Sequence, residues 1–332
     1  MKNNQITSLR GILIFLIMIY HYTYKFEELF EISTISFWGQ QYLGIIGSAS
    51  FFIISGYFIF PNKLDNFSVN GYLKKKIFRL WPTYAIGITI TFLSISIFGL
   101  PGRECNFIDY ILNMFMINGF IGTRYVDGAH WYITYLLLFI FITTIIVILQ
   151  KKYEVNRMTL VNSWSVIDLV FTILSKYFEM NSRIYMLIGE KYVAFFILGI
   201  VIKEMQHNKD FKRYVFSILC AMCVILLKEH WITIIGVLIF LFSFVLAINY
   251  KLKFLNAKTL VYIGGISYPL YIIHQNLGYQ LMLCMTKMLN KFSNIYILVT
   301  IIMAILIATL LQYMSEKFAN LLKNKSIGKQ NF

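Results

Sequence analysis

Charged residues are scarce in this chain. Asp, Glu, Lys and Arg together make up 14% of its 332 residues, whereas 58% are hydrophobic. A water-soluble domain of this size needs far more polar surface, so the composition excludes one and predicts a polytopic membrane protein. Acidic residues are fewer than basic ones, with 15 Asp and Glu against 30 Lys and Arg. The net charge of +15 is compatible with nucleic-acid binding, but the placement of the basic residues argues against it.

Cysteine is equally sparse, and the four residues form no recognisable disulfide framework. Cys220 and Cys223 form a C-x-x-C inside an apolar segment that lacks the strand and helix context of a redox motif, so packing is the favoured interpretation. The first apolar run continues into YHYTYKFEE instead of a small-residue cleavage site, so we expect it to remain as a span. We find no repeat, low-complexity linker or appended soluble domain, and we expect one membrane domain over residues 1–332.

Long apolar runs predict an all-α protein with about ten membrane spans. The expected spans are Leu9–Tyr24, Tyr42–Phe60, Leu80–Leu100, Trp131–Leu149, Leu160–Phe178, Ile184–Ile202, Tyr214–Leu227, Trp231–Asn249, Leu260–Leu283 and Asn294–Tyr313. The only long loop, from about Pro101 to His130, contains a segment, FIDYILNMFMINGF, that is typical of a short interfacial or re-entrant helix.

The basic residues predict the orientation of these spans. If the N-terminus lies in the cytoplasm, 21 of the 30 Lys and Arg residues fall on the cytoplasmic side and 8 on the outer side, with Lys191 inside a span. This asymmetry follows the positive-inside rule and places both termini in the cytoplasm. The basic excess is therefore mainly a topology signal, and we expect a lipid bilayer as the surroundings and no nucleic-acid partner.

The first expected span contains an arginine near its start and a histidine about three turns later. Arg10 and His21 are separated by ten residues, or about 16 Å along a helix. If Arg10 lies at the membrane surface, His21 lies near the middle of an apolar core about 30 Å thick. A titratable imidazole at that depth indicates a functional site. The alternative is a structural histidine satisfied by a neighbouring helix, and the spacing alone does not decide between the two.

A second histidine is expected at comparable depth. The segment GGISYPLYIIHQN places His274 about 20 Å along the ninth span, with Tyr271 one turn earlier on the same face. A polar site shared by His21 and His274 is the simplest explanation of two such residues.

Cations gather at the cytoplasmic entrance of the third span, in KKKIFRLWP. Lys74 and Lys75 are typical of an anchor at lipid headgroups. Lys76 and Arg79 lie one turn apart, and Arg79 is close to the apolar boundary, where an anion-binding role is favoured because its guanidinium suits phosphate oxygens. Arg10 enters from the same side. Pro82 either starts or kinks the span.

Two further segments have competing interpretations. In FFIISGYFIF, Ser55 and Gly56 favour close helix packing, with Ser55 bonded to another helix, over direct catalysis. In AHWYITYLL, His130, Trp131 and Tyr135 fit either the aromatic belt of any membrane interface or a rim that stacks against sugar rings. Composition does not separate these two alternatives.

In combination these segments resemble the acyltransferase 3 family of integral membrane O-acyltransferases. The matching elements, in chain order, are Arg10 and His21; Phe51, Phe52, Ser55 and Gly56; Lys76, Arg79 and Pro82; His130 and Trp131; and Ser267, Tyr268, Tyr271 and His274. Many members carry a glutamate where this chain has Leu136, and the esterase-like or racemase domains of some relatives are missing here.

The resemblance implies transfer of an acyl group, usually acetyl, from cytoplasmic acyl-coenzyme A to a hydroxyl of a glycan outside a bacterial cell membrane. His21 would be the general base, since imidazole titrates near neutral pH. Arg10, Tyr271 and His274 would assist it. Arg10, Lys76 and Arg79 would bind the coenzyme, and the acceptor would contact His130, Trp131, Tyr135, Ser267 and Tyr268.

Beyond acyl-coenzyme A as the donor substrate, we expect no permanently bound cofactor and no metal. Proteins of polysaccharide biosynthesis, or further copies of this chain, are the expected protein partners. The main alternative is an exporter or flippase for lipid-linked glycans, which would predict inverted repeats that we do not find. A scaffold subunit of a polysaccharide synthase is a further option.

Overall fold

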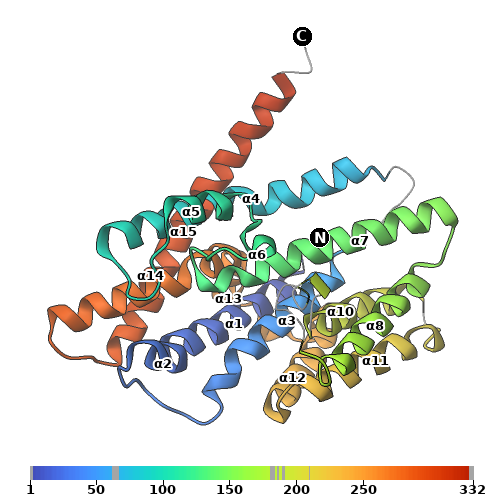
Figure 1. The fold of residues 1–332 in the computed structure, drawn as a ribbon, viewed down its shortest axis with the longest axis horizontal. Helices are drawn as coiled ribbons and strands as arrows, with labels where there is room; N and C mark the ends of the chain where they lie inside the picture. The colour runs from blue at the N-terminus through green and yellow to red at the C-terminus, as the bar shows by residue number, and fades with distance from the viewer. Residues whose placement is uncertain are drawn as a thin grey trace. The chain divides into compact units, whose positions relative to one another are not determined.

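The computed structural model is all-helical over the residues it describes, which are 3–61, 67–179, 184, 187–188, 191–208 and 210–328. No β-strand occurs in this part of the chain. Its helices are α1 (Asn4–Tyr20), α2 (Phe26–Phe30), α3 (Leu43–Tyr57), α4 (Val69–Phe98), α5 (Phe107–Met114), α6 (Asn118–Ile121), α7 (Trp131–Tyr153), α8 (Arg157–Leu174), α10 (Tyr192–His207), α11 (Lys212–Lys228), α12 (Trp231–Ile248), α13 (Lys258–Gly265), α14 (Ser267–Met288) and α15 (Ile295–Gly328) (Figure 1). The predicted all-α class is confirmed.

Each of the ten expected spans overlaps a helix, although the start of the expected span 184–202 lies partly outside the described residues. Within the described residues, six helical segments are long and apolar enough to cross a membrane. These segments are Asn4–Phe30, Val69–Phe98, Gly128–Tyr153, Arg157–Leu174, Trp231–Ile248 and Ile295–Leu321. The chain is thus a multi-pass membrane protein by length and composition. The number of ten spans and the sides of the two termini stay predictions.

The expected ninth span is not one helix but two. It breaks at Ile266 between α13 and α14, where the hydroxyl of Ser267 donates to the carbonyl of Gly264 at 2.8 Å. Pro269 explains the break, because it has no backbone N–H to donate to the carbonyl of Gly265 in a continuous helix. A proline is tolerated in the first turn of α14, where backbone N–H groups have no helical partner.

The third expected span also differs, because α4 begins eleven residues earlier than predicted, at Val69. The cationic segment therefore belongs to the helix itself, and Pro82 lies inside α4 and does not start it. The hydroxyl of Tyr268, from α14, donates to the carbonyl of Leu80 at 3.0 Å beside this proline. The long loop contains α5 and α6, so the helix expected in it is confirmed.

The chain forms two compact units, each built from separate segments. Unit 1 comprises residues 1–44, 74–131 and 252–332. In it, α1 packs along α13, and α14 contacts both α1 and α15 (Figure 1). Glycine makes the first contact possible: a Cβ on Gly11 would lie 2.9 Å from the backbone nitrogen of Gly264. Close helix contact through small residues is typical of membrane proteins.

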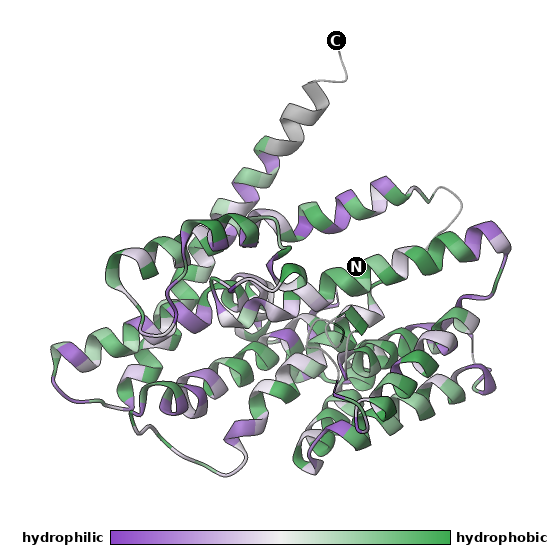
Figure 2. Ribbon diagram, viewed as in Figure 1, coloured by the Kyte–Doolittle hydropathy of each residue, from purple (hydrophilic) through white to green (hydrophobic). Residues whose placement is uncertain are grey.

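Unit 2 comprises residues 45–73 and 132–251. Its α3 and α10 cross closely, since a Cβ on Gly56 would collide with the backbone of Phe196. Ser55 bonds to the hydroxyl of Tyr132 in α7 at 2.8 Å. The packing interpretation of the Ser-Gly pair is thus confirmed. Figure 2 shows that α7 is hydrophobic along most of its length and becomes hydrophilic at its end, where Lys151 and Lys152 lie.

Candidate active site

His21 lies in a π-helical turn that joins α1 to α2. The turn spans His21–Lys25, so the backbone is helical from Asn4 to Phe30 with a local change of pitch that begins at His21. Such turns are rare and occur mainly at functional sites. The next residue, Tyr22, is buried, and its hydroxyl donates to the carbonyl of His274 at 2.7 Å. Gly278 permits this contact, because a Cβ there would collide with the Tyr22 ring.

The imidazole of His21 contacts two buried rings of α14. Its Nδ1 lies 3.0 Å from the hydroxyl of Tyr279, and its ring centroid lies 5.0 Å from that of His274. Tyr279 and His274 are fully buried, whereas His21 is partly exposed. The Tyr279 hydroxyl also accepts from Nε2 of Gln275 at 3.4 Å. This arrangement holds a partly exposed imidazole between two buried aromatic rings.

His274 has one nitrogen bonded and one unpaired. Its Nδ1 lies 2.8 Å from the carbonyl oxygen of Tyr271. Because a carbonyl only accepts, Nδ1 carries the proton, and in a neutral ring Nε2 holds the lone pair. Nε2 is buried and has no hydrogen-bond partner among the described residues. Such an atom can accept a hydrogen bond from a substrate or a water.

A short loop, Val126–His130, is bonded to the middle of α14. The Oδ2 of Asp127 accepts from the backbone N–H of Asn276 at 2.9 Å, and Nε2 of His130 donates to the carbonyl of Ile272, also at 2.9 Å. The N–H of Asn276 and the carbonyl of Ile272 are four residues apart, and such a pair normally bonds to each other within a helix. The side-chain amide of Asn276 donates to the carbonyl of Val126 at 2.8 Å. The loop therefore fixes α14 directly beside His274.

Tyr271 and His274 lie in this site, as the sequence predicts. The ring of Tyr271 lies 5.9 Å from that of His274, and its hydroxyl donates to the carbonyl of Ala129. This hydroxyl has only one proton to donate, so the arrangement favours a supporting role for Tyr271 over stabilisation of an oxyanion.

The residues expected to hold the acceptor come from several elements of the two units. His130 is fully buried, which differs from an exposed rim, and Trp131 is partly exposed at the start of α7. Ser267 and Tyr268 bond to backbone carbonyls of α13 and α4. Tyr135 belongs to unit 2, where its ring lies 4.9 Å from that of Tyr192. Their roles toward a substrate stay predictions.

The three cations expected to bind the coenzyme lie on two helices of unit 1. Arg10 is partly exposed on α1, eleven residues before His21. Lys76 and Arg79 lie one turn apart on α4, with Arg79 exposed. Their common role in phosphate binding stays a prediction. Among the described residues, no group of three or more His, Cys, Asp and Glu side chains is arranged to hold a metal ion.

The sequence-based prediction misses several residues of the site, among them Tyr279 and Asp127. Tyr279 lies eight residues after Tyr271 and four after Gln275, so the helical period of α14 puts all three on one face, a signal that was present in the sequence. Asp127 comes from the long loop, and no periodic pattern indicates where such a loop folds back.

Comparison with known proteins gives the family. No curated protein and no solved structure matches the chain. The family model Acyl_transf_3, described as an acyltransferase domain, matches residues 3–313. That range contains every residue of the site and nearly the whole chain, and the chain therefore belongs to the acyltransferase 3 family.

Proposed function

We propose that this protein moves an acyl group, acetyl in the simplest case, from cytoplasmic acyl-coenzyme A to a hydroxyl of a glycan on the outer side of a bacterial cell membrane. The observation that carries the proposal is the partly exposed His21, held between Tyr279 and His274 in a member of an acyltransferase family. Arg10, Lys76 and Arg79 would bind the phosphates of the coenzyme, since guanidinium and ammonium groups suit phosphate oxygens.

His21 acts as the general base in this mechanism. With its Nδ1–H donated to the Tyr279 hydroxyl, its Nε2 has a free lone pair. The acceptor hydroxyl loses its proton to Nε2 as its oxygen attacks the thioester carbon. The tetrahedral intermediate then collapses, the carbon–sulfur bond breaks, and the coenzyme thiolate takes the proton back from Nε2. The products are an ester and free coenzyme A, and no covalent acyl-enzyme forms.

Tyr279 orients the imidazole of His21 and stabilises its charged form. The Tyr279 oxygen accepts from Nδ1 throughout, and a hydrogen bond to a charged group contributes about 1.5–3 kcal/mol. The unpaired Nε2 of His274 lies in the adjacent ring and offers a second acceptor for a proton or a substrate hydroxyl. Arg10 and Tyr271 complete the proposed catalytic set. His130, Trp131, Tyr135, Ser267 and Tyr268 remain the proposed acceptor contacts.

A single membrane domain over residues 1–332, working in the bilayer, would carry out this reaction without a permanently bound cofactor. Polysaccharide-biosynthesis proteins, or further copies of the chain, are the proposed partners.

The test compares surface glycans from the wild type, a deletion strain and a strain carrying His21→Gln. We expect the O-acyl signals in the NMR spectrum to disappear in the deletion strain and to fall about 100-fold or more with His21→Gln, because general-base catalysis contributes about that factor. The matched control is His207→Gln, at an exposed position at the end of α10, which should keep full O-acylation.

Two outcomes would contradict the proposal. An unchanged O-acyl content with a reduced amount of glycan would favour an exporter. Radiolabel that stays on His21 after incubation with labelled acyl-coenzyme A alone would replace direct transfer with a covalent intermediate.

A further inference from the structure

Arg103 reaches into the site from the loop that follows α4. Its backbone N–H donates to the carbonyl of Leu100 at 3.0 Å, and its side chain extends to Gly128. A Cβ on Gly128 would lie 2.6 Å from Nη1 of Arg103 and 3.1 Å and 3.2 Å from the amide oxygen and nitrogen of Gln275. The guanidinium and the amide thus converge on Gly128, the one residue of Val126–His130 that has no side chain.

Both the Arg103 guanidinium and the Gln275 amide can accept a further polar partner. Arg103 makes no ion pair within the described part of the chain. The nearby carboxylates are engaged elsewhere: Glu104 is exposed and accepts from the backbone of Gly102, and the two oxygens of Asp127 accept from two backbone N–H groups. The Oε1 of Gln275 is buried without a hydrogen-bond partner in that same part. A half-buried guanidinium without a counter-ion is costly, and an incoming anion would offset that cost.

Gln275 links this position to His21 through Tyr279. The amide of Gln275 bonds to the Tyr279 hydroxyl, which bonds to Nδ1 of His21. Arg103 reaches the same amide, because its Nη1 and both amide atoms of Gln275 converge on Gly128. An anion bound at Arg103 would therefore lie beside the group proposed to react.

Arg103 follows the end of α4 that is opposite the cations proposed to bind the donor, which favours contact with the acceptor. Lys76 and Arg79 lie near the start of α4, whereas Arg103 follows its end at Phe98. The 22 residues from Lys76 to Phe98 span about 33 Å of helix. If the phosphates of the donor bind at the Lys76 end, Arg103 serves the other substrate.

We propose that Arg103, assisted by Gln275, binds a carboxylate or phosphate of the acceptor, so that the preferred acceptor is an acidic glycan. This inference rests on the proposed function. The guanidinium offers two parallel N–H donors that match the oxygens of either anion.

The test uses the full-length protein in lipid nanodiscs, acyl-coenzyme A, and the glycan isolated from the deletion strain. The glycan is supplied untreated, with its carboxyl groups reduced to alcohols, or with its phosphates removed. We expect one of the two treatments to raise the acceptor KM of the wild type about 10- to 100-fold, the range expected for loss of a charge-assisted hydrogen bond, and to leave the donor KM unchanged. The effective treatment identifies the anion.

Variants connect this effect to the residue. Arg103→Gln should raise the KM for the untreated glycan by the same factor and be insensitive to the treatment, and Arg103→Lys should recover part of the affinity. Arg124→Gln removes an exposed charge from the same loop and should behave as the wild type. Gly128→Ala keeps the charge but displaces the flexible end of Arg103, so it should reproduce Arg103→Gln even if that variant folds poorly.

The inference is overturned if the acceptor glycan is neutral, or if Arg103→Gln lowers turnover equally on treated and untreated glycan. If the deletion strain loses no O-acyl groups, the proposed function has failed. The anion site is then tested by thermal unfolding with oligoglucuronate or inorganic phosphate. Stabilisation of the wild type and the Arg124→Gln variant, but not of Arg103→Gln, would support the site, and no difference among the three would overturn it.

Discussion

Tyr279 is the residue in closest polar contact with the proposed base, and its hydroxyl can be removed without changing the size of the ring. The Tyr279→Phe variant should lower kcat about 10- to 100-fold, because the lost hydrogen bond to the charged imidazole contributes about 1.5–3 kcal/mol in the transition state. The donor KM should not change, since the donor phosphates are proposed to bind at Arg10, Lys76 and Arg79 and not at Tyr279. Steady-state kinetics in nanodiscs measure both constants.

The matched control is Tyr262→Phe. Tyr262 also bonds through its hydroxyl, to Thr309 at 2.6 Å, but it is exposed and lies outside the site. Its loss should leave kcat unchanged. If both variants have the wild-type kcat, the contact between Tyr279 and His21 has no role in the reaction.

Among single residues, the sequence allows prediction of titratable side chains that lie within apolar segments. A histidine inside an apolar run is conspicuous wherever its helix packs, so His21 and His274 could both be predicted, and the structure places their rings 5.0 Å apart. Tyr279 is inconspicuous, because tyrosines are common in this chain. Arg103 follows no periodic pattern, and only the folded loop brings it to Gly128.

At the scale of elements, α14 depends on a carboxylate from outside the helix. Asp127 accepts from two backbone N–H groups, those of Ala129 and Asn276, and is fully buried. In the Asp127→Asn variant, the amide NH₂ would face one of these donors. We expect a destabilisation of about 1–3 kcal/mol, the cost of an unsatisfied buried group. A lower apparent midpoint of thermal unfolding in detergent would show it.

The control for this prediction is Asp210→Asn. Asp210 forms an exposed ion pair with Arg213 at 3.1 Å, and such pairs contribute only about 0–1 kcal/mol. Its midpoint should match the wild type. An Asp127→Asn variant with a normal midpoint but no activity would make Asp127 a participant in the reaction and not a structural support of α14.

Helices could be predicted from the sequence more reliably than their ends and interruptions. Hydropathy predicts the position of α7 and α12 within a few residues, because both are apolar along most of their length. It misses the break at Ile266, which Pro269 causes through one missing hydrogen bond that does not alter the apolar character of the segment. It also misses the start of α4, since a helix can continue past the apolar boundary into a charged segment.

At the scale of the whole molecule, the ten-span topology remains to be tested. The distribution of Lys and Arg and the ten expected spans place residue 4 inside, residue 124 outside and residue 253 inside. If only the six long apolar segments cross the membrane, the pattern becomes inside, inside, outside, or its inverse. The two topologies therefore differ at these positions whichever side the N-terminus occupies.

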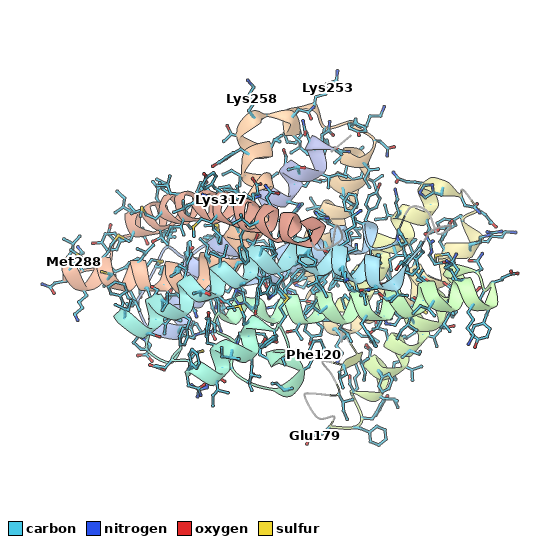
Figure 3. The ribbon with its side chains drawn as sticks, turned by 90° about the horizontal axis from the view of Figure 1, so that it is seen from above. Phe120, Glu179, Lys253, Lys258, Met288 and Lys317 are labelled. Atoms are coloured by element: carbon cyan, nitrogen blue, oxygen red, sulfur yellow. The ribbon has the colours of Figure 1, made fainter. Side chains whose placement is uncertain are left out.

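Single cysteines at these three positions distinguish the topologies. Asn4, Arg124 and Lys253 are exposed, and Figure 3 shows Lys253 pointing away from the protein. The four native cysteines are free and should first be replaced by alanine. Native Cys105 is a poor reporter of the loop that contains Arg124, because burial, reinforced by Asp109, raises the pKa of its thiol to about 11 and leaves little thiolate to react.

In intact cells, a membrane-impermeant maleimide should label the Arg124→Cys variant and leave Asn4→Cys and Lys253→Cys unlabelled until the membrane is permeabilised. This result requires an odd number of crossings before residue 124, and therefore that α3, which is only 15 residues long, crosses together with α1 and α4. Labelling of Lys253→Cys alone, or of Asn4→Cys and Arg124→Cys together, would leave α3 on one side of the membrane. Arg103 lies in the same loop as Arg124, so the labelling of Arg124→Cys also shows on which side of the membrane Arg103 lies. A cytoplasmic position would contradict the proposed contact of Arg103 with an acceptor outside the cell.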